Sequence, residues 1–422
     1  MRQTRQHVIA AMSALCLAST GAFAQEPVTL TFAAHYTDQE MAPLTACFRR
    51  YEAQTPGIRI DYRQTPIADF MQNVMTSRVS GASPDIYNVY SIWGKRLVDN
   101  AILAEPPQEI TDFIAEGYEK STVQSAVVDD RLWGIPAEVA TYMLIYNKLL
   151  FAEAGIAAPP SDWPGVMEAA AKIAKRDTLG RVEVAGYAFG PSVANAAHPF
   201  RTLLFSKGSQ ILTDDLMGTH LTEPAAVDVL EGQARLFREG LTSASHQIRD
   251  FPAGRIGMII GANWMKQLMR EGLGDKLDAT VGVAPIPGGP DWKTYQYSFY
   301  QAVDAKSAHA NEAWTFLRWL NTPTTPGQRS CVGDMLVSLG SLTANKADLA
   351  ASEAEFGDAF SKPFVDALRS GRAVSDPNIA QTAEMDRILR ASIEEAWLGR
   401  MTAADALAKA DGEITDLLAL PQ

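Results

Sequence analysis

Aromatic and polar side chains follow several predicted strands at the points where those strands end. The candidates are His35 and Tyr36 after residues 28–32, Asp69 after residues 58–62, Tyr90 and Ser91 closing residues 85–90, and Phe189 and Gly190 closing residues 182–189. Because ligands of α/β sheets bind outside the carboxyl ends of the strands, we expect these residues to line a ligand-binding crevice. Rings supply apolar contact, and a few hydroxyl or carboxylate groups fix orientation. The structural alternatives stay open: Asp69, for example, also suits the first turn of a helix.

Motifs for covalent or metal chemistry are absent from the sequence. It contains no Gly-x-Ser-x-Gly elbow, no phosphate-binding Gly-Lys-Ser/Thr loop and no Cys-x-x-Cys. The histidines after residue 24 lack metal-ligand spacing; they are His35, His198, His220, His246 and His309. No cofactor and no metal are therefore expected. Paired carboxylates of a glycoside hydrolase leave no fixed spacing, so that kind of enzyme remains an alternative.

Alternating strand and helix patterns position these candidates. After the strand at 28–32, Asp38 is the expected cap of a helix whose apolar residues recur at helical spacing, and a second helix at 70–79 should end at Gly81. The pattern restarts after Asn147, with a strand at 182–189, helices near Phe200 and at 224–237, and strands at 255–260 and 281–284. From residue 311 the chain is almost wholly helical. Such repetition predicts a mainly parallel sheet covered on both faces.

The first residues have the pattern of an export signal. Arg2 and Arg5 precede a short apolar run at 8–17, which is too short to span a bilayer, and Ala22-Phe23-Ala24 is a cleavage signal. We expect cleavage after Ala24 and a periplasmic product. Leu15 is too bulky for a lipidation signal at Cys16.

Composition narrows the partners. Removing 24 of the 422 residues leaves 398, enough for two or three domains. The net charge of −12 and the lack of a basic run argue against nucleic acid and anionic membranes as partners. Two cysteines remain, Cys47 and Cys331; in an oxidising compartment they can pair or stay as buried thiols, and the sequence alone does not decide between these states.

Several short motifs, taken in order, resemble the family-1 extracellular solute-binding proteins that serve bacterial ABC importers, the group that includes maltose-binding proteins. The matching segments are Ser83-Pro84-Asp85-Ile86, Asn100-Ala101-Ile102-Leu103, Leu132-Trp133-Gly134-Ile135-Pro136, Tyr146-Asn147-Lys148, Ala154-Gly155 through Pro159-Pro160 to Trp163, Gly254-Arg255-Ile256-Gly257-Met258 with Trp264, and Glu312-Ala313-Trp314-Thr315-Phe316-Leu317. Ala101 stands where the family usually has glycine.

The resemblance implies an α/β, two-lobed periplasmic binding protein fold with three interlobe crossings and a helical C-terminal region. The expected N-terminal lobe contains residues 25–139 plus 298–335, and the C-terminal lobe contains 140–297 plus 336–422. Closure of such lobes on a ligand is a hinge motion. The implied partners are a small carbohydrate and the membrane permease subunits of an importer, with the protein itself a monomer and not an enzyme.

The resemblance also adds candidate ligand residues. Trp264 matches a position that often stacks on a sugar ring, although a core tryptophan at a helix start is the alternative; Trp163 and Trp314 are expected to be structural. Glu138 lies at a crossing, where its carboxylate could accept sugar hydroxyls or hold the hinge. Relatives commonly have small residues where this chain has 295–301, rich in aromatics.

Strict alternation along that crossing would send Tyr295, Tyr297 and Phe299 to one side and Ser298 and Tyr300 to the other. Tyr297 and Tyr300 join the candidates, and a narrowed cleft would suit one or two sugar rings. Two further alternatives remain open: a glycoside hydrolase using Asp69 and Glu138, and the same fold tuned to an anionic solute such as a glycerol phosphate or a sulfonated sugar.

Overall fold

The computed structural model describes residues 27–190 and 192–420; the expected export signal at 1–24 lies outside this range. Within the described residues one long mixed sheet runs through the molecule, with strands in the order β2-β1-β3-β11-β6-β9-β8-β7. These strands are β1 (Val28–Ala34), β2 (Ile58–Gln64), β3 (Ile86–Tyr90), β6 (Ile135–Asn147), β7 (Lys175–Arg176), β8 (Val182–Tyr187), β9 (Ile256–Ala262) and β11 (Thr294–Val303). The short strands β10 (Val281–Ala284) and β12 (Leu342–Thr343) pair with β6, and β13 (Ala373–Val374) pairs with β11; β4 (Val127–Val128) and β5 (Arg131–Leu132) form a separate hairpin.

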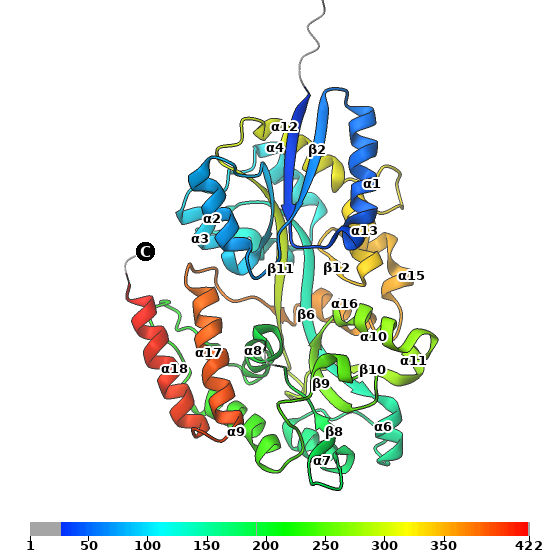
Figure 1. Ribbon diagram of the computed structural model, residues 1–422, viewed down its shortest axis with the longest axis vertical. Coiled ribbons are helices and arrows are strands. Elements are labelled where there is room, and N and C mark those ends of the chain that lie inside the picture. The colour runs from blue at the N-terminus through cyan, green and yellow to red at the C-terminus, as the bar shows by residue number, and fades with distance from the viewer. Residues whose placement is uncertain (1–26, 191, 421–422) are drawn as a thin grey trace, which may run out of the picture.

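Two strands are shared by both halves of the molecule. β6 and β11 pair antiparallel and run lengthwise through Figure 1, so that the chain passes between an upper and a lower group of elements. The upper group contains α1 (Asp38–Gln54), α2 (Phe70–Ser80), α3 (Gly94–Asp99), α4 (Gln108–Gly117), α12 (Ala310–Leu320) and α13 (Cys331–Leu339). The lower group contains α6 (Lys148–Glu153), α7 (Trp163–Ile173), α8 (Ala197–Ser206), α9 (Pro224–Arg238), α10 (Met265–Leu273), α11 (Leu277–Thr280), α17 (Thr382–Trp397) and α18 (Ala403–Leu418). The remaining helices are α5 (Lys120–Val123), α14 (Lys346–Ala351), α15 (Glu353–Phe356) and α16 (Lys362–Arg369).

The parallel part of the sheet agrees with the sequence pattern. β1 pairs parallel with β2 and β3, and β8 pairs parallel with β9. The sequence pattern does not predict the antiparallel insertion of β11 between β3 and β6, because this pairing joins segments that are far apart in the chain. The expected third crossing and the exact lobe boundaries stay predictions.

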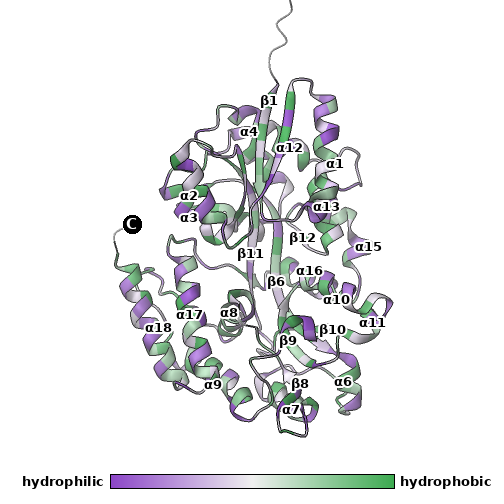
Figure 2. Cartoon of the chain, in the orientation of Figure 1, coloured by the Kyte–Doolittle hydropathy of each residue, from purple (hydrophilic) through white to green (hydrophobic). Residues whose placement is uncertain are grey.

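The core covers both faces of the sheet. Alternation along β6 sends Tyr142 and Leu144 into one buried cluster and Met143 and Ile145 into the other. Hydrophobic residues concentrate along the strands, and the outward helix surfaces are mainly polar (Figure 2). Each cluster contains residues from both halves, so burial on both faces stabilises the crossing strands along their length.

The first helix is capped one residue earlier than the sequence predicted, at Thr37 and not at Asp38. The N-cap of α1 is Thr37, whose hydroxyl accepts from the backbone N–H of Glu40 while the Glu40 carboxylate accepts from the backbone N–H of Thr37. This reciprocal capping box satisfies two helix-terminal donors, and Asp38 instead sits in the first turn, where a negative charge is also favourable. Gly81 ends α2 as expected, with a φ of +71°.

The two cysteines are paired. A disulfide joins Cys47 of α1 to Cys331 of α13 across a sequence separation of 284 residues. The bond connects the start of the chain to a helix that follows β11, and so it closes the upper half of the molecule.

Candidate ligand-binding cleft

A large cavity lies where the upper and lower elements meet. Its volume is about 1230 Å³, and its walls include His35, Tyr36, Tyr90, Trp93, Glu138, His198, Trp264, Tyr297, Phe299, Ser341, Asp386 and Arg387. This volume exceeds the roughly 300–1,000 Å³ of common small-ligand sites. A preference for one or two sugar rings stays a prediction.

Stacked rings form one wall of the cleft. Phe299 of β11 stacks on His35, with ring centroids 4.5 Å apart, and on Tyr90, with centroids 4.9 Å apart. Tyr90 also meets Tyr297 edge to face at 5.0 Å. His35 and Tyr90 come from the ends of β1 and β3, which are parallel neighbours, so the strand-end rule brings them together as predicted. Offset and edge-to-face contacts of this kind hold the rings in place.

Glu138 is a buried carboxylate within this wall. One carboxylate oxygen accepts a hydrogen bond from the Tyr36 hydroxyl at 2.5 Å, and the other accepts from the Ser341 hydroxyl at 2.6 Å. Burial raises the pKa of Glu138, while the two hydroxyl donors act in the opposite direction. The same burial, with the neighbouring Glu138 charge, raises the pKa of Tyr36, which therefore stays a hydroxyl donor.

His35 is neutral at physiological pH. Burial lowers the pKa of its imidazole to about 4, and its Nδ1 atom has no hydrogen-bond partner among the described residues. The ring thus offers the cleft an apolar face and one unused polar atom rather than a positive charge.

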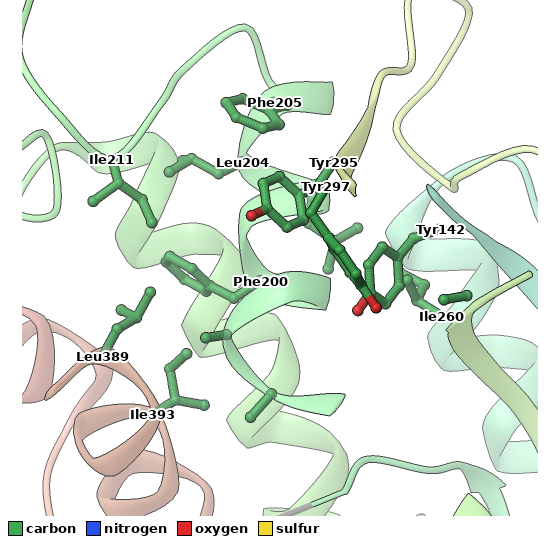
Figure 3. Packing of buried hydrophobic residues seen from close by; sticks show 14 of the residues in the cluster. Tyr142, Phe200, Leu204, Phe205, Ile211, Ile260, Tyr295, Tyr297, Leu389 and Ile393 are labelled. Carbon is green, nitrogen blue, oxygen red and sulfur yellow. The ribbon is translucent and has the colours of Figure 1, made fainter. Parts of the chain in front are cut away.

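A chain of hydrogen bonds leads from the cleft into the lower half. The Trp264 indole N–H donates to the Tyr297 hydroxyl at 2.9 Å, Tyr297 also interacts with the Tyr142 hydroxyl, and the Tyr142 hydroxyl lies 2.8 Å from Nδ1 of His198. Figure 3 shows Tyr142, Tyr295 and Tyr297 close together beside α8, and Phe205 of α8 contacts the Tyr295 ring. Trp264 precedes α10, Tyr142 belongs to β6 and Tyr297 belongs to β11. This series of hydrogen bonds therefore connects the crossing strands to the lower elements.

Buried charges lie at the end of that chain. The Arg201 guanidinium pairs with Asp386, with an N–O distance of 2.7 Å, and with Asp376, and it lies over the Tyr295 ring. His198 Nε2 lies 3.6 Å from Asp386. Burial alone would raise the pKa of Asp386, but Arg201 and His198 outweigh it and hold the pKa below its usual value. Burial lowers the pKa of His198, which favours the neutral ring.

Sequence reasoning missed His198, Arg201, Asp386 and Arg387. They lie on α8 and α17, which are far apart in the chain, and only the packed structure brings them to one place. An arginine in the mostly apolar segment 197–206 was the available signal, because a buried arginine needs a partner.

The predicted candidates separate into two groups. His35, Tyr36, Tyr90, Glu138, Trp264 and Tyr297 line the cleft.

The other five candidates lie elsewhere. Asp69 is exposed at the N-cap of α2, and Ser91 is buried, with its hydroxyl oxygen accepting from the backbone N–H of Ser298 at 3.2 Å. Phe189 and Gly190 border a separate cavity of about 180 Å³ beside Trp397. Tyr300 is fully buried against Gly94 and Gly134.

Alternation along β11 accounts for part of this division, because it sends Tyr300 to the side opposite Tyr297 and Phe299. The pairing of β11 with β6 shifts in register between Ser298 and Tyr300. Tyr297 and Phe299 both reach the cleft as expected. Since Asp69 is outside the lining, the geometry gives no support to a carboxylate pair formed by Asp69 and Glu138.

Comparison with known proteins decides the family. Residues 33–325 match the family described as bacterial extracellular solute-binding proteins. The chain belongs to this family. A binding protein of Brucella abortus (strain 2308) is 25% identical over 330 residues, which cover 76% of the present solute-binding protein and 77% of the relative.

Solved structures share the two-lobed architecture of this solute-binding protein. A substrate-binding protein of Listeria monocytogenes in complex with cycloalternan has a TM-score of 0.77 at 17% identity, covering 94% of this chain and 100% of that chain. A solute-binding protein of Thermotoga lettingae bound with α-D-tagatose has a TM-score of 0.79 at 16% identity, with the same coverage. The sugar-binding protein MalE of Xanthomonas citri has a TM-score of 0.77 at 18% identity, covering 93% and 98%. The predicted two-lobed α/β fold is thus confirmed.

No helix in the described part of the solute-binding protein is long and apolar enough to cross a membrane. No group of three or more histidine, cysteine, aspartate or glutamate side chains there is arranged to hold a metal ion.

Proposed function

We propose that this solute-binding protein captures a carbohydrate or sugar derivative between its two lobes and delivers it to the permease of an ABC importer. The observation that carries the proposal is the cleft itself, in which stacked rings adjoin a buried carboxylate. Sugars have apolar C–H faces and hydroxyl edges, which match ring faces and fixed hydrogen-bonding groups respectively. The carbohydrate complexes among its structural neighbours support the same ligand class.

The proposed site assigns a role to each cleft residue. Trp264 offers a ring face, Phe299 supports the His35 and Tyr90 rings, and Tyr90 and Tyr297 offer hydroxyl groups beside rings. Glu138 accepts hydroxyl bonds and holds Tyr36 and Ser341 in place. Asp69, Ser91, Phe189, Gly190 and Tyr300 are left out of the proposed contacts because they lie outside the cleft lining.

The proposed working cycle follows from the two-lobed fold. The lobes, 25–139 plus 298–335 and 140–297 plus 336–422, close on the ligand and present it to the membrane subunits. A monomer in the periplasm, cleaved after Ala24, suits this cycle because each molecule must open and close freely. Binding is reversible and leaves the ligand unchanged.

A thermal-shift screen followed by calorimetry tests the proposal. Neutral, amino, acidic and phosphorylated sugars are added to the purified mature protein, and we expect at least one to raise the melting temperature and bind one to one. The same mixtures are then examined for hydrolysis. Many turnovers of a glycoside per protein molecule, or binding of non-carbohydrate solutes only, would overturn the proposal.

A further inference from the structure

Carboxyl groups outnumber cations in the cleft wall and directly behind it. Arg201 is 1% exposed and is shared by two carboxylates, Asp376 and Asp386. Glu138 is 6% exposed, and its hydrogen-bond donors are the neutral hydroxyls of Tyr36 and Ser341. Among the described residues no arginine or lysine pairs with Glu138. Three carboxyl groups, those of Glu138, Asp376 and Asp386, therefore accompany one guanidinium in the wall and directly behind it.

Neighbouring groups do not restore the balance. His35 and His198 are neutral near pH 7, because burial lowers both imidazole pKa values. Around the rim, Glu40 and Glu271 add carboxylates, and the Arg387 guanidinium is bonded to Glu384. Arg96 is exposed to solvent, where its charge is screened. An anionic solute would meet uncompensated carboxylates here, which is unfavourable.

The surroundings of Glu138 favour an organic cation over a metal ion. The faces of aromatic rings attract cations, and Trp264, Tyr297 and Phe299 lie in the same cleft. A cavity of about 1230 Å³ is far larger than an ion, and no metal-ligand cluster occurs in the described residues. A ligand with both a polyhydroxy framework and an ammonium group would use the rings, the hydroxyls and the carboxylate together.

We propose that the captured solute is an amino sugar, whose protonated amine lies against Glu138 and the neighbouring ring faces. This inference rests on the proposed function and specifies the ligand class of the same site. The sequence analysis kept an anionic solute as an alternative ligand. The amino-sugar proposal favours a cationic ligand instead. Glu138 then acts as the specificity-determining residue.

A matched ligand series tests the charge preference. Calorimetry near neutral pH compares D-glucosamine with D-glucose, N-acetyl-D-glucosamine and D-glucuronate, and compares the β-1,4-linked disaccharide of glucosamine with cellobiose and N,N′-diacetylchitobiose. In each set the framework is kept while the charge changes. We expect the amine to bind about tenfold tighter or more than its neutral counterpart, which corresponds to about 1.4 kcal/mol.

Two matched variants test whether Glu138 causes the preference for the amine. Glu138→Gln removes the charge but keeps the shape, so the ratio of the amine's affinity to the neutral sugar's affinity should fall towards one. Glu52→Gln is the control, because Glu52 is also a buried glutamate but lies on α1, bonded to Arg49 and to the backbone N–H of Ile60. The Glu52→Gln variant should keep the full preference for the amine over its neutral counterpart. The ratio of two affinities in one variant is unaffected by any loss of folded protein.

The outcomes separate the two proposals. Equal or tighter binding of the neutral or acidic member overturns the amino-sugar inference and leaves carbohydrate capture standing. An amine preference that survives Glu138→Gln also overturns it, since Glu138 would not be the counter-charge. If no sugar of any charge binds, the proposed function fails together with the inference.

Discussion

Trp264 has its single hydrogen-bond donor already bonded within the protein, so the ring itself is what it presents to the cleft. The indole N–H donates to Tyr297, and the side chain is only half-buried. Trp314, in contrast, is 3% exposed and packs in the core between α12 and its neighbours. We therefore propose a binding role for Trp264 and a packing role for Trp314.

The first prediction concerns this difference. Trp264→Ala should weaken binding of the preferred sugar on the order of thirtyfold or more, because truncating a large aromatic anchor commonly costs 2 kcal/mol or more. Calorimetry measures the affinity. Trp314→Ala is the matched control: it should lower the free energy of unfolding by roughly 3–5 kcal/mol, and leave the affinity of the folded fraction unchanged. Unchanged affinity with a much lower melting temperature for Trp264→Ala would remove Trp264 from the site.

The second prediction is a pH dependence of stability caused by His35. The imidazole pKa falls from 6.5 to about 4 on burial, so between these values the unfolded chain binds a proton that the folded chain does not. The contribution is fully present above pH 6.5 and is lost as the pH falls towards 4, on the order of 3 kcal/mol in total. Denaturant unfolding across this range should show a shallower loss for His35→Gln than for the wild type. An identical slope for both would contradict the assignment.

The sequence located part of the cleft for a definite reason. His35, Tyr36 and Tyr90 were found because parallel neighbouring strands end at one edge of a sheet, and Trp264, Glu138 and Tyr297 because the family resemblance marked their segments. Asp69 was predicted to line the cleft but lies at the N-cap of α2, because a residue that follows a strand can also begin a helix. His198 and Asp386 could not be found, because their meeting depends on how α8 and α17 pack.

At the scale of elements, the disulfide joins two helices that carry different parts of the chain. α1 follows the first strand, and α13 leads through Gly340 to Ser341, which donates to Glu138 in the cleft. The bond therefore restrains the helix that precedes one of the cleft's hydrogen-bond donors.

The third prediction follows from this restraint. Cys47→Ser together with Cys331→Ser should lower the free energy of unfolding by about 2–5 kcal/mol, because the bond closes a very long loop and so limits the unfolded chain. Denaturant unfolding under non-reducing conditions measures the loss. Adding a reductant should reproduce it in the wild type and have no effect on the double variant; an effect there would mean that the reductant acts elsewhere.

The fourth prediction concerns the contact of α8 with α17. Arg201→Met would leave Asp376 and Asp386 buried without their cation, and breaking such a pair costs roughly 3–5 kcal/mol of stability. Arg235→Met is the control, because Arg235 pairs with Glu239 on the surface of α9 and should matter by less than about 1 kcal/mol. Chemical denaturation of both variants compares them. Similar losses would show that the buried cluster is not held by Arg201.

Most elements were predictable from local pattern, and the sheet order was not. β1, α1, β2, α2 and β3 followed from apolar spacing and turn residues. The placement of β11 between β3 and β6 depends on pairing across the whole chain, which local periodicity does not encode. The cap of α1 differed by one residue because Thr37 forms a capping box with Glu40, a bond pair stronger than a single acidic cap.

At the scale of the whole molecule, the two halves should approach each other when ligand binds. Val79 of α2 and Leu179, between β7 and β8, are exposed and lie in opposite halves (Figure 1). Dyes on Val79→Cys and Leu179→Cys should show increased energy transfer on addition of the preferred sugar, since closure around a ligand is a hinge motion. Leu149→Cys with Leu179→Cys, both in the lower half, should show no change. A constant signal from the first pair would contradict closure.

The position of β11 also governs when the chain can finish folding. β3 and β6 cannot be joined into one sheet until β11 (Thr294–Val303) has been synthesised. The disulfide of Cys47 likewise cannot form before Cys331 has been synthesised. Distant pairing of this kind slows folding, because long loops must close before their contacts form. We expect a nascent chain lacking these residues to remain without a completed upper half. We therefore expect the upper half to be completed only after Cys331 has been synthesised and can pair with Cys47.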